Sequence, residues 1–398
     1  MKDLVANWLR TLAYYCSCLI PRRSDLWAFG CPESGFSDNP KYLFLWISAN
    51  CPDIEVVWLT YSKKVYSELR TRGYRSELRG TWAARLVALR AGLHVFCHYS
   101  TDVYFPFCGG CLHINLWHGV GIKNVQYAVK SGPSAKIIKR AESPLFRLER
   151  LDLFRGPDML LATSEMMAQH FSKCFRIPIE RCPQIGYPRL DVMLDENLRL
   201  SALAFGDYAC INEAFTNFDE VYIYMPTWRD TGRDFLADAF PDLPRFSRLL
   251  ASRNALLYVK LHRHTTVNLP AEFANIQKWP DGLDIYPVLN CFNVLITDYS
   301  SILYDWIFMK DSGVVIYTFD YDSYTKIDHD LAFPFEENIV GVKADDFECL
   351  CAVIQTGAAM APLPKEKLAL LRERFWGEVG SLASPRLTAY LKHLASLK

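Results

Sequence analysis

Short apolar runs alternate with segments of helical periodicity along the first half of the chain. Runs of four to six apolar residues are typical of buried strands, whereas apolar positions three and four apart indicate a helix with one buried face. The pattern predicts helices that include residues 41–47 and 82–91, and it predicts strands at 26–29, 54–59, 94–97, 114–117 and 160–162. This alternation predicts a parallel sheet flanked by helices.

The same alternation begins again in the second half of the chain. It predicts terminal helices at 368–375 and 385–397, and strands at 221–225, 256–261, 294–296 and 314–317. The predicted fold class is therefore α/β, with two doubly wound, Rossmann-like domains, which we place at residues 1–195 and 196–398. Ligands bind beyond the carboxyl ends of strands in such sheets, so the residues that directly follow strands become the candidates for function.

No run in the chain reaches the roughly 18 apolar residues that span a bilayer. The run that comes nearest is residues 4–20, within the first 23 residues, and it is interrupted by Arg10. Two interpretations stay open. The stretch is either a helix at the membrane surface, with Trp8, Leu9, Leu12 and Tyr15 toward the acyl chains, or an amphipathic helix packed on the core. In the first case Arg22 and Arg23 would contact lipid headgroups.

Composition and charge refine this picture. A chain of 398 residues with 51% hydrophobic residues can bury two cores. Its formal net charge is zero, yet residues 1–190 hold 25 of the 44 Lys and Arg residues and only 15 of the 44 Asp and Glu residues. This excess is either an ordinary solvated face or a surface for an anionic membrane or polyanionic substrate. Nucleic acid is not among the partners that we expect.

The 13 cysteines are scattered without a repeated paired spacing, which favours reduced thiols in the cytoplasm. The pair Cys108 and Cys111, with His113 close behind, lacks the second pair that a zinc site needs. We therefore predict no metal site and identify no cofactor. Neither a Gly-x-Gly-x-x-Gly segment after the first strand nor a Walker sequence is present, which disfavours hydride transfer and ATP chemistry.

Ser300 and Ser301 stand where a predicted strand meets a predicted helix. The unpaired N–H groups of a first helical turn, the helix dipole and two hydroxyls together form an anion site that suits phosphate. The alternative is that a serine only caps the helix. Asp305 lies one turn further along the same face and is a candidate acceptor for a ribose or polyol hydroxyl.

One histidine follows a strand in each predicted domain, His118 in the first and His262 in the second. His118 precedes Gly119, where a ligand can approach the backbone closely, so its imidazole is a candidate base for a hydroxyl near neutral pH. Four cations near strand ends are candidates to neutralise a diphosphate without metal, or else form surface ion pairs: Lys123, Arg189, Arg229 and Lys260.

Six segments, taken in order, resemble the CDP-glycerol glycerophosphotransferase family, which builds teichoic acids and related capsular polymers. They are residues 37–44 (SDNPKYLF), 116–123 (LWHGVGIK), 186–191 (GYPRLD), 224–230 (YMPTWRD), 260–262 (KLH) and 296–301 (ITDYSS). The resemblance covers roughly residues 26–390. As a set these segments are specific, although each alone is weak.

The resemblance implies a glycosyltransferase-B-type fold, with two domains facing across a cleft and a CDP-alcohol held mainly by the second. An acceptor hydroxyl would attack the β-phosphorus of CDP-glycerol and displace CMP. His118 matches the general base, and His262 matches a second histidine that acts on the phosphate or leaving group. The matched donor-binding positions are Arg189, Pro226, Thr227, Lys260, Ser300, Ser301 and Asp305.

Two departures keep alternatives open. The family's usual Trp-His-Gly-Thr-Pro-Leu-Lys stands here as Trp-His-Gly-Val-Gly-Ile-Lys, and its Arg-Gly-x-Tyr pattern is replaced near residues 326–330. Transfer of ribitol phosphate, transfer of a sugar from a nucleotide-sugar, and a non-catalytic scaffold in a capsule-assembly complex remain alternatives. The expected partners are CDP-glycerol, a lipid-linked or polysaccharide acceptor and an anionic membrane. The expected location is cytoplasmic, at the inner face of the cell membrane.

Overall fold

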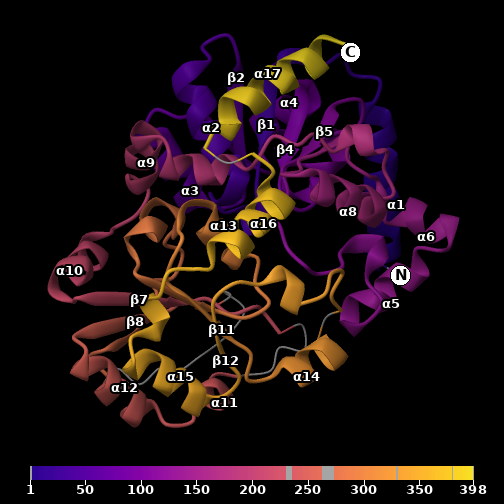
Figure 1. The fold of residues 1–398 in the computed structure, drawn as a ribbon. Coiled ribbons are helices and arrows are strands. Elements are labelled where there is room, and N and C mark those ends of the chain that lie inside the picture. Colours follow the sequence, from indigo (N-terminus) through magenta and orange to yellow (C-terminus); the bar gives the residue numbers. More distant parts are fainter. Residues whose placement is uncertain (1, 230–234, 262–272, 329, 379, 398) are drawn as a thin grey trace. The chain divides into compact units, whose positions relative to one another are not determined.

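The computed structural model describes residues 2–229, 235–261, 273–328, 330–378 and 380–397, which form two compact units (Figure 1). Unit 1 comprises residues 1–118, 137–205 and 380–398, and unit 2 comprises residues 119–136 and 206–379. The division differs from the predicted one in three ways. The chain leaves unit 1 after residue 205 rather than 195, its C-terminal segment returns to unit 1, and the short segment 119–136 belongs to unit 2.

Unit 1 is built on a six-stranded parallel sheet in the order β3-β2-β1-β4-β5-β6. Its strands are β1 (Arg23–Phe29), β2 (Glu55–Thr60), β3 (Ser76–Leu78), β4 (Ala91–Phe96), β5 (Leu112–Asn115) and β6 (Met159–Leu160). Its helices are α1 (Lys2–Ser17), α2 (Asp38–Asn50), α3 (Lys63–Thr71), α4 (Trp82–Arg90), α6 (Pro144–Glu149), α7 (Leu151–Phe154), α8 (Glu165–Phe175), α9 (Glu196–Leu203) and α17 (Ala383–Ser396), and α5 (Gly132–Arg140) leads into it from unit 2.

Unit 2 repeats this plan with strands β7 (Glu220–Tyr224), β8 (Ala255–Val259), β9 (Ile276–Lys278), β10 (Val294–Thr297), β11 (Val314–Tyr317) and β12 (Val342–Ala344). Its helices are α10 (Ala209–Asn217), α11 (Leu236–Ala239), α12 (Leu243–Ser252), α13 (Ile302–Met309), α14 (Tyr321–Ser323), α15 (Phe347–Gln355) and α16 (Lys365–Trp376). The sheet order is β12-β11-β10-β7-β8-β9, again parallel throughout.

The two sheets share one strand order. In each, the first strand lies at the centre, the next two extend the sheet to one side, and the last three extend it to the other. The order therefore reverses between β1 and β4 in unit 1 and between β7 and β10 in unit 2, which is where such sheets bind ligands. The predicted pair of Rossmann-like domains is confirmed.

Three short strands were absent from the prediction. They are β3, β9 and β12, each three residues long and each at or beside the edge of its sheet. Most of their residues are partly or fully exposed, as in Ile276–Lys278, where only the first residue is buried. Such a segment contains no apolar run, so the hydrophobic pattern does not reveal it.

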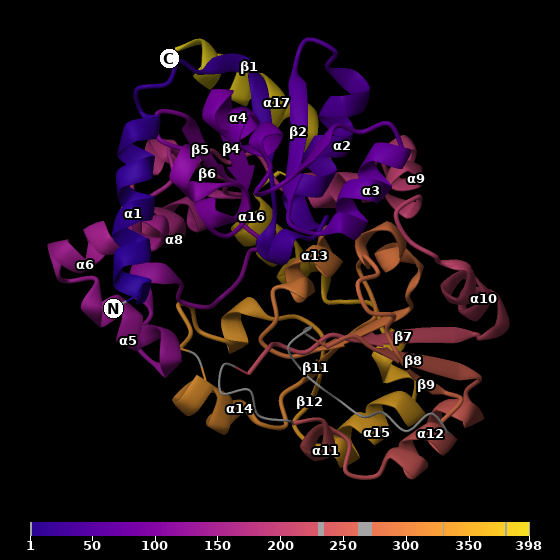
Figure 2. The ribbon, with the colours of Figure 1, turned by 180° about the vertical axis from the view of Figure 1, so that it is seen from behind.

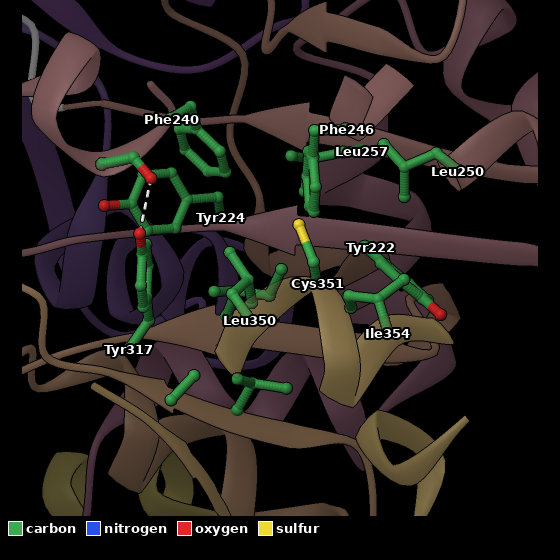
Figure 3. Packing of buried hydrophobic residues seen from close by; sticks show 14 of the residues in the cluster. Tyr222, Tyr224, Phe240, Phe246, Leu250, Leu257, Tyr317, Leu350, Cys351 and Ile354 are labelled. Carbon is green, nitrogen blue, oxygen red and sulfur yellow. Dashed lines mark hydrogen bonds between the residues drawn. The ribbon is translucent and has the colours of Figure 1, made fainter. Parts of the chain in front are cut away.

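The core of unit 2 is rich in aromatic rings (Figure 3). Phe240 packs edge-on against Tyr224 with ring centroids 5.2 Å apart and lies 5.3 Å from Phe246. Tyr317 satisfies its buried hydroxyl by donating to the carbonyl of Ala239 at 2.5 Å. This packing fixes the central strand β7, which carries candidate site residues at its end.

The C-terminal helix α17 packs against β1 and α2 of unit 1, and Figure 1 shows it in yellow among the indigo elements. Its first turn is held by Asp191, whose two carboxylate oxygens accept the N–H groups of Ala383 and Ser384, each at 2.7 Å. Burial raises the pKa of Asp191 to about 6. The predicted motif at residues 186–191 thus ties the end of the chain to the first unit.

The N-terminal helix α1 packs against α6 (Figure 2). Several of its large apolar side chains are exposed. Among them, Leu9 and Leu12 are each 60% exposed. Arg22 does not extend toward solvent as expected, because its guanidinium donates to several backbone carbonyls, including that of Ala88 at 2.8 Å. Among the described residues, no helix combines the length and apolar character needed to cross a bilayer.

Candidate active site

In unit 1 the candidate base His118 follows β5, at the carboxyl end of the sheet. The side chain of Asn115 accepts the N–H of Trp117 at 2.8 Å, which turns the chain sharply as the strand ends. Trp117 has a φ of 54°, in the left-handed region that bulky residues rarely adopt. Strained backbone of this kind persists where the surroundings fix it and is concentrated at functional sites.

Asn39 is one of the groups that fix this turn. Its amide nitrogen donates to the carbonyls of Leu116 and Trp117 at 3.1 and 2.9 Å, and its amide oxygen accepts the N–H of Arg189 at 3.1 Å. Asn39 is fully buried at the start of α2. A single amide group thereby joins the strand end, the helix and the segment around Arg189.

Arg189 supports the backbone of His118 directly. Its Nη1 donates to the carbonyl of His118 at 2.6 Å and to the carboxylate of Asp38 at 3.0 Å. The side chain is only 2% exposed. We expected Arg189 among the donor-binding residues, whereas the structure places it in unit 1 as a support for the candidate base.

The tautomer of His118 follows from its contact with Cys97. Nδ1 lies 3.1 Å from the carbonyl oxygen of Cys97, and a carbonyl can only accept, so Nδ1 carries the proton. Nε2 is then the basic nitrogen of the neutral ring. The ring of His98 lies 5.4 Å away, and burial lowers the pKa of His98 to about 3, so this neighbour stays neutral. His118 is exposed and therefore open to a substrate hydroxyl.

In unit 2 the segments after β7 and β10 meet at the reversal of strand order. Asp298, which follows β10, accepts the N–H of Thr227 at 2.8 Å through Oδ1 and pairs with Arg229 at 2.9 Å through Oδ2. The Thr227 hydroxyl is buried and has no hydrogen-bond partner among the described residues. A buried hydroxyl without a partner is costly, so Thr227 is a strong candidate for contact with a ligand.

Arg229 lies at the centre of this network. Its Nη1 donates to the carbonyl of Thr227 at 2.6 Å, while Nε and Nη2 donate to the carboxylate of Asp320 at 2.9 Å each. The side chain is completely buried. We expected Arg229 to neutralise a diphosphate. In the structure its Nε, Nη1 and Nη2 all donate within unit 2, and this network orders the segments around the candidate site.

The serine pair opens α13 as predicted. Ser301 is the N-cap residue, yet its side chain makes no capping hydrogen bond. Both serines are half-buried. Gly121 faces this pair, and a Cβ at that position would be in ordinary van der Waals contact with the Cβ of Ser301, at 3.7 Å. The hydroxyl of Ser301 is thus not consumed by capping, which favours the anion-site interpretation over a simple cap.

The segment that follows His118 is anchored within unit 2 by Asp330. One oxygen of its carboxylate accepts the N–H groups of Lys130 and Ser131, at 3.1 and 3.2 Å, and the other accepts the side-chain amide of Asn124 at 2.5 Å. Lys123, a candidate cation, forms a single antiparallel bridge with Leu331 in the same contact. This anchor holds residues 119–131, which include Gly119 and Gly121, on unit 2.

Asp305 is buried on α13 and accepts the hydroxyl of Tyr286 at 2.7 Å. Pro226 and Lys260 follow β7 and β8 and are half-buried. His262 lies outside the described residues. The thiols of Cys108 and Cys111 lie against backbone carbonyls, and His113 lies 3.0 Å from the Cys108 carbonyl, which accounts for this trio by hydrogen bonding within the fold.

Several residues that organise the candidate site were not among the site residues predicted from the sequence. Asn39, Asp298 and Asp330 all organise the candidate site, yet each bonds to residues far away in the chain. Asp298 and Asn39 do lie within two of the six segments that carry the family resemblance, 296–301 and 37–44, but neither was singled out there. Asp330 lies in the segment that departs from the family pattern.

Comparison with known proteins identifies relatives along nearly the whole chain. A family model described as CDP-Glycerol:Poly(glycerophosphate) glycerophosphotransferase matches residues 13–390. A teichoic acid poly(glycerol phosphate) polymerase of Staphylococcus epidermidis is 22% identical over 309 residues, which are 73% of this chain and 40% of the relative. A teichoic acid ribitol-phosphate primase of Bacillus spizizenii is 24% identical over 288 residues, which are 66% of this chain and 69% of the relative.

Among solved structures, the wall teichoic acid polymerase TagF matches with a TM-score of 0.75 and 19% identity, covering 100% of this chain and 96% of that one. The glycosyltransferase-B-type fold is thereby confirmed. The chain spans less than half the length of the polymerase relative and about two thirds of the primase.

Proposed function

Because the chain belongs to the CDP-glycerol:poly(glycerophosphate) glycerophosphotransferase family, we propose that it transfers glycerol phosphate from CDP-glycerol to a hydroxyl of a lipid-linked or glycan acceptor. The product would extend or initiate a teichoic-acid-like or capsular polymer. The observation that carries this proposal is the orientation of His118. Its Nδ1 donates to the Cys97 carbonyl, which leaves Nε2 as the basic nitrogen of the ring.

His118 takes the proton of the acceptor hydroxyl as its oxygen attacks the β-phosphorus. The bond between that phosphorus and the oxygen bridging to CMP breaks, and CMP leaves. A neutral imidazole is the ordinary form near pH 7, so no metal is required to generate the nucleophile. Arg189 and Asn39 act as positioning residues, since they hold the backbone on which the imidazole sits.

On the donor side, the hydroxyls of Thr227, Ser300 and Ser301 and the first turn of α13 bind the diphosphate. Fixed donors of this kind stabilise charge that develops on phosphate oxygens during transfer. Lys123 and Lys260 add positive charge, Pro226 and Gly119 shape the backbone, and Asp305 receives a hydroxyl of the ribose or polyol. His262 completes the set on the leaving group.

Ribitol phosphate is the second candidate for the transferred group. It is favoured by the match to the ribitol-phosphate primase, which is as similar in sequence as the glycerol-phosphate relatives. A thermal-shift comparison separates the two donors, because the tighter ligand raises the melting temperature more. A larger shift with CDP-ribitol than with CDP-glycerol would reassign the donor.

We also propose that α1 lies on the cytoplasmic face of an anionic membrane, where a lipid-linked acceptor is found. Its exposed large apolar residues are Leu4, Val5, Leu9, Leu12 and Tyr15. Replacing Leu9 and Leu12 by serine should release the protein from vesicles that contain phosphatidylglycerol. The same replacement at Leu86 and Leu200, which are exposed on other helices, should leave binding unchanged.

The function is tested by release of CMP from CDP-glycerol in the presence of acceptor. His118→Ala should lower the turnover by about 100-fold or more, as is usual for loss of a general base. His393→Ala removes an exposed histidine from α17 and serves as the matched control. Normal CMP release by His118→Ala would overturn the mechanism.

A further inference from the structure

A pocket of about 480 Å³ lies at the carboxyl ends of the first four strands of unit 1. Its walls include Cys31 after β1, Tyr61 after β2, Arg79 after β3 and Asp102 after β4. The order of the sheet reverses between β1 and β4, so the pocket occupies the position at which open parallel sheets bind ligands. Its volume suits a ligand the size of a sugar phosphate.

Three arginines from different elements give the pocket an excess of positive charge: Arg10 on α1, Arg79 after β3 and Arg85 on α4. Two acidic residues, Glu33 and Asp102, also line it. Oδ2 of Asp102 accepts the N–H groups of His98 and Tyr99. That carboxylate is therefore engaged by backbone, and burial further raises its pKa to about 7.

Arg79 is fixed in place before any ligand arrives. Its Nη1 donates to the carbonyl of Thr101 at 2.9 Å, and its guanidinium lies 4.2 Å from the ring centroid of Tyr61 and 5.1 Å from that of Tyr104. Its Nε is buried and has no hydrogen-bond partner among the described residues, and the same holds for Nε of Arg85. Buried donors without acceptors, on a preorganised cation, indicate that an anionic ligand satisfies them.

The remaining wall is aromatic. Tyr104 stacks on Phe107 with centroids 4.9 Å apart, Phe105 lies beside them, and Tyr61 is 58% exposed. Flat apolar rings suit the C–H face of a sugar ring, while the arginines suit phosphate oxygens. The pocket thus combines the two kinds of surface that a glycosyl phosphate requires.

The pocket shares a loop with the support of His118. Residues 97–104 follow β4 and provide both the Cys97 carbonyl that orients the imidazole and three wall residues, Thr101, Asp102 and Tyr104. Gly30 at the end of β1 packs against this loop so closely that a Cβ there would lie 2.2 Å from the Asp102 carbonyl oxygen. A ligand in the pocket and the base are therefore held by one continuous, tightly packed segment.

We propose that this pocket binds a glycosyl phosphate of the acceptor, with its phosphate on Arg10, Arg79 and Arg85 and its sugar on the tyrosine and phenylalanine rings. The proposal rests on the proposed function, which it extends by naming the acceptor class. The phosphate and sugar could belong to a soluble glycan phosphate or to a lipid-linked one. Both sources present the same phosphate and sugar ring to the pocket.

The first test measures binding to the full chain by isothermal titration calorimetry. Glucose 1-phosphate should bind more tightly than either inorganic phosphate or free glucose, and its affinity should fall with salt. The double variant Arg10→Gln/Arg85→Gln removes two positive charges and leaves the buried contacts of Arg79 intact. It should weaken binding of glucose 1-phosphate by about tenfold or more. Arg70→Gln/Arg90→Gln, at two exposed arginines of the same unit, is the matched control.

A decyl phosphodiester of glucose distinguishes the two sources. Tighter binding than glucose 1-phosphate assigns the site to a lipid-linked acceptor, and equal or weaker binding assigns it to a soluble one. Equal binding of glucose 1-phosphate to the wild type and to Arg10→Gln/Arg85→Gln would overturn the proposal.

The second test separates this site from the proposed function. Arg10→Gln/Arg85→Gln should raise the KM for acceptor by about tenfold while leaving the dissociation constant of CDP-glycerol unchanged. An unchanged KM for acceptor, with normal transfer, would refute the acceptor site and leave the function standing. The opposite result is that the wild type transfers nothing, while the variant still loses its binding of glucose 1-phosphate. That result would refute the function and leave a glycosyl phosphate site.

Discussion

Arg229 donates from Nε and Nη2 to the two carboxylate oxygens of Asp320, each at 2.9 Å, and neither side chain reaches solvent to more than 6%. The planar fork of a guanidinium matches a carboxylate in this geometry. The same Arg229 also pairs with Asp298, so one cation holds the segments that follow β7, β10 and β11. The candidate donor-binding residues of unit 2, such as Thr227, are thereby held by a buried ion-pair network.

Arg229→Met should destabilise unit 2 strongly. Two buried carboxylates, Asp298 and Asp320, lose their cation, and breaking a buried ion pair typically costs about 3–5 kcal/mol. The urea midpoint for unfolding should fall accordingly. Arg245→Met removes an exposed partner of Glu348 and should leave the midpoint in place, so an equal response of both variants would refute the assignment.

Thr227→Val should weaken donor binding while the fold is retained. The hydroxyl makes no hydrogen bond within the described part of the chain, so its removal costs the unliganded protein little. A lost hydrogen bond to phosphate weakens binding by about tenfold, measured as the dissociation constant of CDP-glycerol. In contrast, Thr297→Val removes a bond to the Met225 carbonyl and should lower the melting temperature. Unchanged affinity in Thr227→Val would show that the hydroxyl does not contact the donor.

Asp330→Ala should loosen the segment that follows His118. The amides of Lys130 and Ser131 lose their acceptor, so their hydrogen exchange should accelerate by about tenfold or more. Mass-spectrometric exchange over residues 119–136 measures this. Asp322→Ala, at an exposed carboxylate nearby in the sequence, is the control, and identical exchange in both variants would contradict the anchor.

Acid should destabilise unit 1 through buried histidines. Burial lowers the pKa of His94 to about 3 from an ordinary value of 6.5, so below pH 6.5 the unfolded chain binds a proton that the folded chain refuses. Stability from this group is complete above pH 6.5 and is lost as the pH falls toward 3, by up to about 1.4 kcal/mol per pH unit. His98 acts in the same direction.

The test compares urea midpoints at pH 7 and pH 5. His94→Gln retains a side-chain donor for the Ala88 carbonyl and removes the titrating group, so the loss of stability between the two pH values should be smaller. His393→Gln, at an exposed histidine, should behave as the wild type. If His94→Gln lost as much stability between pH 7 and pH 5 as the wild type, His94 would not be the source of the acid sensitivity.

The hydrophobic pattern predicted the central strands well, because strands buried on both faces contain continuous apolar runs such as residues 294–296 of β10. It also placed the serines at the start of α13, since they stand between this apolar run and the helical periodicity that begins at Ile302. The family inferred from six motifs is confirmed by the match over residues 13–390. Local sequence therefore carries both the fold class and the family.

The roles of the arginines could not be predicted in the same way. Arg189 and Arg229 lie in recognised motifs near strand ends, where a ligand-binding cation would also lie. Arg189 pairs with Asp38, 151 residues away, and Arg229 pairs with Asp298 and Asp320, 69 and 91 residues away. Asp38, Asp298 and Asp320 only become partners once the sheets have formed. Pairing over such separations is a property of the topology and has no local signature.

Asn39 supports the turn before His118 through an amide that must donate twice and accept once. Conversion of this amide to a carboxylate would turn both donors into acceptors that face carbonyl oxygens. Asparagine usually undergoes this ageing reaction when the next backbone nitrogen attacks the side chain, which requires an N–H. The next residue is Pro40, whose nitrogen has none. The sequence Asn39-Pro40 therefore protects the turn from deamidation and makes its geometry chemically durable.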